Sequence, residues 1–214
     1  MLGLSEAAVE DLRYLLGRGY GRISSVKFVG DKYLLDKSQR LMLYRGVYPP
    51  EGAMAHKRKL VKAEEVKGTR LAIDGFNVLW TVDGALKGRT VFMCDDGLVR
   101  DISAIHGSPT KEDLTRPLGL IVQALSGLGP AEANFVFDRL VSRSGELAKQ
   151  MAQMLKTNSV KGGASTATSA DFDVIRRGEI VSSSDSVIVD KSQKVFDLAA
   201  HILYILLRMD LPKV

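Results

Sequence analysis

The chain has 214 residues, a length that suits one domain of ordinary size or one domain with a smaller appendage. Hydrophobic residues make up 45% and charged residues 26%, values that exclude a disordered or collagen-like chain. The single cysteine, Cys94, excludes an internal disulfide, and with only three histidines it excludes the usual structural zinc sites. A reducing, cytoplasmic compartment is therefore expected.

The charge and the hydropathy of the sequence indicate which kinds of partner and which kinds of targeting segment to expect. The net charge of +5 favours a polyanion. A signal peptide is not expected, because Glu6, Glu10 and Asp11 lie where its apolar core would be. The most apolar stretch, residues 195–207, is shorter than the roughly 20 residues of a bilayer span. We expect a soluble protein without a membrane partner, for which the sequence leaves an oligomer open.

The first third of the chain is basic and predicted to be helical. Residues 1–70 carry 14 Lys and Arg against 8 Asp and Glu, whereas residues 71–214 carry 16 against 17. Ser5 can cap a first helix that ends at Gly17, and a second helix is predicted from about Ser25 to Tyr44. Pro49 and Pro50 are expected to end this region. The predicted domains are a small basic helical domain (1–55), a basic linker (56–69) and an α/β domain (70–214).

The linker contains a cluster of cations. This cluster consists of Lys57, Arg58, Lys59 and Lys62. Positive charge of this kind can contact the phosphate backbone of a nucleic acid, and it can equally be a solvated linker. Both interpretations stay open on the sequence alone.

From residue 70 onwards, short apolar runs alternate with helical stretches, which is typical of an α/β fold with mainly parallel strands. The predicted strands are Leu71–Asp74, Thr90–Asp95, Asn134–Asp138, Ser165–Asp171 and Ile180–Asp185. The predicted helices cover approximately residues 112–127, 144–157 and 192–209.

Each predicted strand ends in an aspartate. The five residues are Asp74, Asp95, Asp138, Asp171 and Asp185. Ligands of open α/β sheets bind at the carboxyl ends of the strands, so these carboxylates are expected to converge there. Clustered carboxylates repel one another unless a cation is present, and oxygen ligands select Mg²⁺ or Mn²⁺. For any one of them, a helix cap or a turn is the competing interpretation.

Other residues are predicted to support such a site. Gly75 lets the chain approach a ligand, and Asn77 can orient the Asp74 carboxylate or contact phosphate. Ser184 supplies a hydroxyl beside Asp185, and Asp190 follows in the same segment. Asp95 and Asp96 could also contribute, although Asp96-Gly97 is equally a hairpin turn signal.

Three motifs stand out in the second part of the chain, namely IDGFNVL, SADFDVI 96 residues later, and IVSSSDSVIVD. Through these motifs the sequence resembles the PIN and PIN-like nuclease superfamily. The whole chain also resembles a family of uncharacterised, mostly archaeal proteins through IDGFNVL, CDDGLVRDISAIHG, SRSGELA and SSSDSVIVD. The superfamily resemblance implies a PIN-like fold, with Asp74 as the first-strand acid, Asp171 as the late acid and Asp185 as the final strand-end acid. The remaining acid could be Asp138, Glu112 or Asp113.

The sequence therefore predicts a metal-dependent nuclease, an endoribonuclease-like hydrolase acting on RNA. Asp74, Asp138, Asp171 and Asp185 would hold Mg²⁺ or Mn²⁺, which would activate a water. One alternative is a catalytically degenerate RNA-binding or RNP-associated module. A further alternative is a metal-dependent phosphohydrolase acting on a small phosphorylated substrate.

Overall fold

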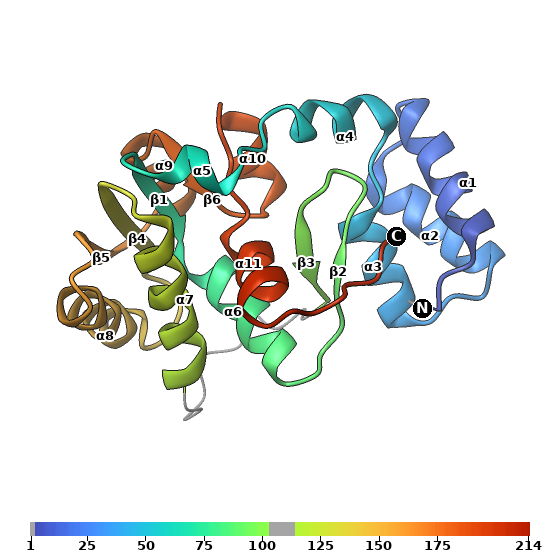
Figure 1. The fold of residues 1–214 in the computed structure, drawn as a ribbon. Coiled ribbons are helices and arrows are strands. Elements are labelled where there is room, and N and C mark those ends of the chain that lie inside the picture. The colour runs from blue at the N-terminus through green and yellow to red at the C-terminus, as the bar shows by residue number, and fades with distance from the viewer. Residues whose placement is uncertain (1–2, 103–113) are drawn as a thin grey trace.

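Short helices build the N-terminal part of the chain in the computed structural model, which describes residues 3–102 and 114–214 (Figure 1). The helices are α1 (Glu6–Gly17), α2 (Arg22–Lys32), α3 (Lys37–Gly46), α4 (Pro50–Lys57) and α5 (Ala63–Val66). Helices α1, α2 and α3 bury a small core that includes Leu12, Val29 and Leu43. The helical N-terminal region predicted from the sequence is present.

The prediction of a single helix from Ser25 to Tyr44 is wrong, because the helical conformation is interrupted between α2 and α3. Leu34 adopts the left-handed backbone conformation with φ 51°, which ends α2. The Asp36 side chain then accepts a hydrogen bond from the Gln39 amide, and the Gln39 side chain accepts one from the Asp36 amide. This capping box starts a new helix.

Pro50 begins helix α4 instead of ending the helical region. Proline suits the first position of a helix, because its missing N–H would have no partner there. The segment predicted as a linker is also ordered against the rest of the chain. Leu60 pairs with Val195, and the Val61 amide donates to the Val195 carbonyl.

A four-stranded parallel sheet forms the centre of the remaining chain. Its strands are β1 (Arg70–Asp74), β4 (Glu132–Asp138), β5 (Gly162–Ala167) and β6 (Ile180–Ser182), in the order β5-β4-β1-β6. Alternate residues of β1 face opposite sides of this sheet, as Leu71 and Ile73 join one core and Ala72 another. Both faces are therefore buried, as is usual for parallel sheets.

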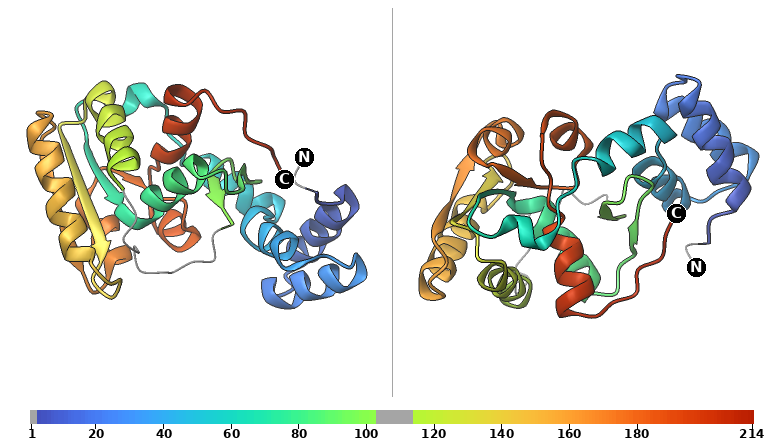
Figure 2. Two further views of the ribbon diagram at one scale, coloured as in Figure 1. Left: turned by 90° about the horizontal axis from the view of Figure 1, so that it is seen from below. Right: turned by 45° about the horizontal axis from the view of Figure 1, so that its top comes forward.

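Helices cover both faces and complete an α/β architecture (Figure 2). They are α6 (Gly75–Leu86), α7 (Thr115–Leu128), α8 (Ser144–Thr157), α9 (Ala170–Arg177), α10 (Ser186–Lys191) and α11 (Leu198–His201), which continues into the π-helix η1 (Ile202–Leu206). Helices α6, α7, α8 and α11 contribute to the larger core, whereas α9 and α10 pack on the opposite face. The helix predicted over 192–209 is shorter because residue 195 pairs with residue 181.

The predicted strand Thr90–Asp95 does not join the parallel sheet. Strand β2 (Val91–Met93) pairs antiparallel with β3 (Val99–Asp101) in a separate hairpin. Asp96 and Gly97 lie in its turn, with Gly97 at φ 81°. This hairpin contacts the N-terminal region, where Phe92 packs with Met42, and the C-terminal Val214 donates to Met93.

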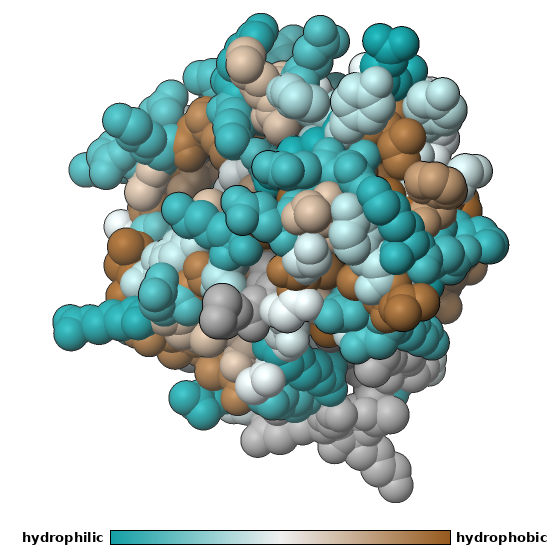
Figure 3. All heavy atoms as spheres, turned by 90° about the vertical axis from the view of Figure 1, so that its right-hand side faces the viewer, coloured by the Kyte–Doolittle hydropathy of each residue, from teal (hydrophilic) through white to brown (hydrophobic). Residues whose placement is uncertain are grey.

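The surface over the N-terminal region mixes hydrophilic and hydrophobic groups (Figure 3). Exposed apolar side chains of this region include Ile23, Phe28 and Leu34. No helix in the described ranges combines the length and hydropathy needed to cross a bilayer.

Candidate functional site

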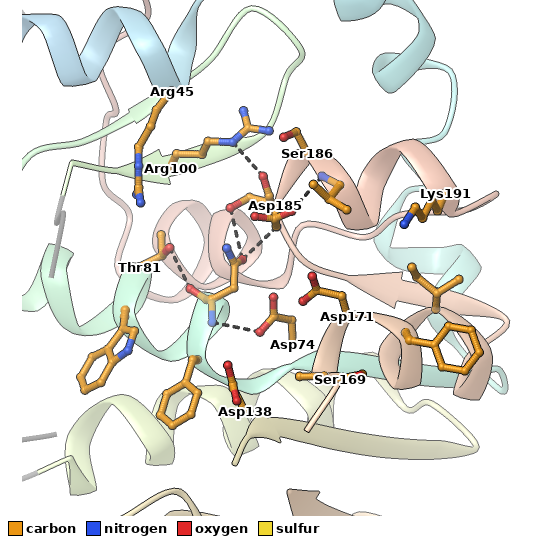
Figure 4. A pocket seen from close by; sticks show the side chains of 18 of the residues that line it. Arg45, Asp74, Thr81, Arg100, Asp138, Ser169, Asp171, Asp185, Ser186 and Lys191 are labelled. Atoms are coloured by element: carbon orange, nitrogen blue, oxygen red, sulfur yellow. Dashed lines mark hydrogen bonds between the residues drawn. The ribbon is translucent and has the colours of Figure 1, made fainter. Parts of the chain in front are cut away.

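A cleft of about 1020 Å³ lies at the carboxyl ends of the parallel strands (Figure 4). Four of the predicted acids line it, namely Asp74, Asp138, Asp171 and Asp185. Other residues of its lining come from the N-terminal region and from β3. The cleft therefore lies where the two parts of the chain meet, and the four acids come from segments far apart in the sequence.

Asp74 is the last residue of β1 and the N-cap of α6. One carboxylate oxygen accepts a hydrogen bond from the Asn77 amide at 3.3 Å, and the other accepts one from Ser183 Oγ at 2.9 Å. Burial, opposed by these two hydrogen bonds and assisted by the nearby Asp185 and Asp171 carboxylates, raises the pKa of Asp74 to about 7. The structure thus holds a carboxyl group in surroundings that disfavour its negative charge.

Asp185 follows strand β6 and caps α10. Its carboxylate accepts hydrogen bonds from the Val187 and Ile188 amides. The neighbouring Ser184 is tied to α6, because the Asn77 side-chain oxygen accepts from the Ser184 amide at 2.8 Å and from its hydroxyl at 3.2 Å. Asn77 therefore fixes the chain beside Asp185, and its backbone amide also positions Asp74.

Asp138 and Asp171 complete the acidic side of the cleft. Asp138 ends β4, as predicted, and accepts a hydrogen bond from the Leu140 amide. Asp171 does not end a strand, because β5 stops at Ala167 and Asp171 lies in the first turn of α9. The small-residue run after β5 turns before that helix, which still brings Asp171 into the cleft. The alternative acids at positions 112 and 113 lie outside the described residues.

The carboxylates affect one another electrostatically. Burial raises the pKa of Asp171, and the Asp185 and Asp138 carboxylates raise it further, while Lys191 opposes the shift. Within the described ranges, no lysine or arginine forms an ion pair with any of the four acids. The cluster is therefore a region of negative charge that a cation would stabilise.

The donor set suits Mg²⁺ or Mn²⁺, since all four groups offer hard oxygen ligands. The part of the chain that the structure describes contains no group of three or more His, Cys, Asp or Glu side chains arranged to hold a metal ion. Mg²⁺ typically binds one or two carboxylates together with waters and substrate phosphates, so a closed cage is not required. Asp74 and Asp185 are the best candidates, because hydrogen bonds orient both carboxylates.

Cations that sequence analysis did not single out line the same cleft. They are Arg22, Arg45, Arg100, Arg176 and Lys191. Their positions in the chain follow no motif, and the packing of the N-terminal region against the β2–β3 hairpin brings Arg22 and Arg45 to the cleft. The cleft thus combines an acidic floor with a basic surround, as binding of a metal and a phosphate would require.

The other predicted acids lie outside the cleft lining. Asp95 accepts hydrogen bonds from the Arg13 guanidinium at 2.9 and 2.5 Å, which ties α1 to the hairpin. Asp96 pairs with Arg100 and His56, and Asp190 accepts from the other nitrogen of His56. The interpretation of Asp96 as a turn residue is correct, and the expected convergence involves four acids instead of five.

The cationic cluster of residues 57–62 also lies outside the cleft lining. Lys59 Nζ donates hydrogen bonds to the Val189 and Asp190 carbonyls at the end of α10, which is a helix-capping role. Lys57, Arg58 and Lys62 lie on the same segment, and none of them lines the cleft. A contact between this segment and a nucleic acid stays a prediction, separate from the cleft.

Gly75 is required by close packing, and its predicted role in the approach of a ligand stays a prediction. A β-carbon at this position would collide with the ring of Phe137. We expect Gly75→Ala to destabilise the protein by about 1–3 kcal/mol through overpacking, measured by urea unfolding. Gly119→Ala is the control, because Gly119 lies in α7 with open space around it and alanine favours helix. Equal stability of the two variants would contradict this account of Gly75.

Two family models match successive parts of this chain. Residues 63–201 match the family described as Domain of unknown function (DUF5616), and residues 4–59 match Protein of unknown function (DUF434). The chain is 34% identical over 191 residues to the Uncharacterized protein MJ0935 of Methanocaldococcus jannaschii, covering 89% of this chain and 90% of that protein. No solved structure matches. The chain therefore belongs to the DUF5616 family.

Proposed function

We propose that this protein is a metal-dependent nuclease that hydrolyses phosphodiester bonds in RNA. The observation that carries the proposal is the meeting of Asp74, Asp138, Asp171 and Asp185 in one cleft that five cationic side chains also line. The resemblance of this part of the chain to the PIN-like nuclease superfamily supports the same chemistry.

Different residues of the cleft would bind the metal, position the carboxylates and attract the phosphate backbone. Asp74 and Asp185 would hold Mg²⁺ or Mn²⁺, with Asp138 and Asp171 completing the negative field. When bound, such a metal neutralises phosphate charge and lowers the pKa of a bound water. Asn77 and Ser183 hold the carboxylates in place, and the cleft arginines attract the phosphate backbone. No histidine or lysine base is needed.

RNA cleavage and thermal unfolding, each measured with and without Mn²⁺ or Mg²⁺, test the proposal directly. We expect the wild-type protein to cut end-labelled single-stranded RNA in the presence of either ion and to stop on addition of EDTA. The same ions should raise the thermal unfolding temperature, since a ligand that binds only the folded state stabilises it. A protein that neither gains stability from Mn²⁺ nor cuts RNA would contradict the proposal.

A second candidate is an RNA-binding module without catalysis. One observation favours it, namely that the described acids form no ready group of three ligands. This candidate predicts salt-sensitive RNA binding that Mn²⁺ leaves unchanged, with no cleavage. The cleavage assay therefore separates the two candidates.

A further inference from the structure

The part of the cleft lining that comes from the N-terminal region has a composition of its own. It contains Arg22 of α2, Tyr44 and Arg45 of α3, and Tyr48. Aromatic rings and arginines that line the same cleft as the acids are what a nucleotide beside a metal-held phosphate would meet. The question is whether these groups are free to bind it.

The charge of Arg22 lacks an acidic partner within the described ranges. Its Nη1 atom donates to the Tyr44 carbonyl at 2.8 Å and to the Val47 carbonyl at 2.7 Å, which fixes the guanidinium without neutralising it. The same group lies 4.6 Å from the centre of the Tyr48 ring and 5.8 Å from that of Tyr44. A rigid, uncompensated cation in a cleft is suited to bind an anion.

Two other cations of this side are already occupied. Arg45 pairs with Asp101 at 3.0 Å, and Arg100 donates to Asp96 and to the Ser184 carbonyl. Of these three arginines, Arg22 is therefore the one whose positive charge is not neutralised by an acidic partner. Beside it, the residue Tyr44 is 43% exposed and lines the cleft, so its ring can accept a stacked base.

We propose that Arg22 and Tyr44 form a subsite for the nucleotide next to the one held at the acids, in a single strand of RNA. The inference rests on the proposed function. An unpaired strand is required, because the stacking ring and the half-buried Asp74 carboxyl line one cleft between two parts of the chain. Arg22 would bind the phosphate and Tyr44 the base, so the N-terminal region completes the site.

Binding of a labelled single-stranded RNA oligonucleotide, with EDTA present and salt varied, tests the subsite. Arg22→Gln should reduce the slope of log affinity against log salt by about 0.7, the value for one phosphate contact to a single strand. Arg22→Lys should keep most of that slope because it keeps the charge. Arg18→Gln is the control, since Arg18 is exposed on the same region and outside the cleft lining.

Tyr44→Ala should weaken binding about tenfold without changing the salt slope, as expected for the loss of one stacked base. Tyr44→Phe should bind as wild type does. Tyr14→Ala is the control, because Tyr14 is 66% exposed and does not line the cleft. Thermal unfolding of each variant checks that the fold is kept.

The outcomes separate the subsite from the nuclease. If wild-type protein cleaves RNA with Mn²⁺ but the Arg22 and Tyr44 variants bind like their controls, the subsite is wrong and the nuclease stands. If these variants lose binding as predicted while no protein cleaves, the subsite stands and the nuclease is wrong. If a single nucleotide binds as tightly as the oligonucleotide, Arg22 and Tyr44 do not hold a neighbouring nucleotide of the strand, and the subsite is wrong.

Discussion

Replacing Asp74 with asparagine is expected to remove metal-dependent RNA cleavage while leaving the protein folded. Asparagine keeps the size of the side chain and its oxygen can still accept from the Asn77 amide, but the charge that holds a metal is lost. Because the metal contributes several kcal/mol to such reactions, cleavage should fall about a hundredfold or more. The rate is measured on single-stranded RNA at saturating Mn²⁺.

The stability of the same variant should move in the opposite direction. The folded-state pKa of Asp74 is raised to about 7, so the native state binds a proton that the unfolded chain releases above its ordinary pKa. The protonated Asp74 carboxyl contributes to the free energy of unfolding at low pH, and this contribution is lost as the pH rises towards about 7. At pH 8 without metal, Asp74→Asn should therefore be more stable than wild type by about 1–2 kcal/mol.

Asp210→Asn provides the control, since Asp210 is exposed and outside the cleft lining. This variant loses the same charge but should keep its metal response and its cleavage rate. Cleavage by Asp74→Asn at the wild-type rate would remove Asp74 from the mechanism.

The acids of the sheet could be predicted because their placement depends on local sequence. Asp74 and Asp138 end apolar strands, and parallel strands bring their carboxyl ends to the same edge. Asp171 enters the cleft for a different reason than predicted, since it lies on α9. Asp95 follows an apolar run of the same appearance, but its strand forms a hairpin outside the sheet. An apolar run alone does not reveal which strand it pairs with.

The basic wall could not be predicted, because it depends on how the N-terminal region packs against the rest. Arg22 carries no motif, and its place in the cleft follows from contacts such as Arg13 with Asp95 and Arg45 with Asp101. These pairs join residues at least 56 positions apart in the sequence. The break between α2 and α3 has a local cause, the capping box of Asp36, which the spacing of apolar residues between 25 and 44 does not reveal.

A buried network joins the N-terminal region, the hairpin and α10, and its loss should have a large effect on stability. The His56 ring lies between Asp96, 2.9 Å from Nδ1, and Asp190, 2.7 Å from Nε2. Asp96 also pairs with the buried Arg100. Asp96→Asn would leave Arg100 uncompensated, and we expect a loss of about 3–5 kcal/mol by urea unfolding. Asp190→Asn removes the exposed partner of the same ring and should cost less than about 1 kcal/mol.

The same network predicts a dependence on pH. Both ring nitrogens of His56 face carboxylates, and only the protonated ring can donate a hydrogen bond to each of them. These hydrogen bonds to Asp96 and Asp190 outweigh the effect of burial and raise the pKa of His56. Although burial alone would raise the pKa of Asp96, the hydrogen bonds from His56 and Arg100 lower it to about 2, so Asp96 stays ionised well below neutral pH. The stabilisation from His56 is thus full below its unfolded-state pKa of about 6.5 and is lost as the pH rises through the higher folded-state value.

Urea unfolding of wild type and His56→Gln at pH 5.5 and 8.5 isolates this contribution, because the other titrating groups, including Asp74, are common to both proteins. Wild type should exceed His56→Gln in stability more at pH 5.5 than at pH 8.5, since glutamine carries no proton to lose. The difference reports the network that holds the N-terminal region against the hairpin and α10, which is the packing that places Arg22 in the cleft. An equal stability difference at the two pH values would mean that folding does not raise the pKa of His56, and that the two carboxylates beside it do not favour its protonated form.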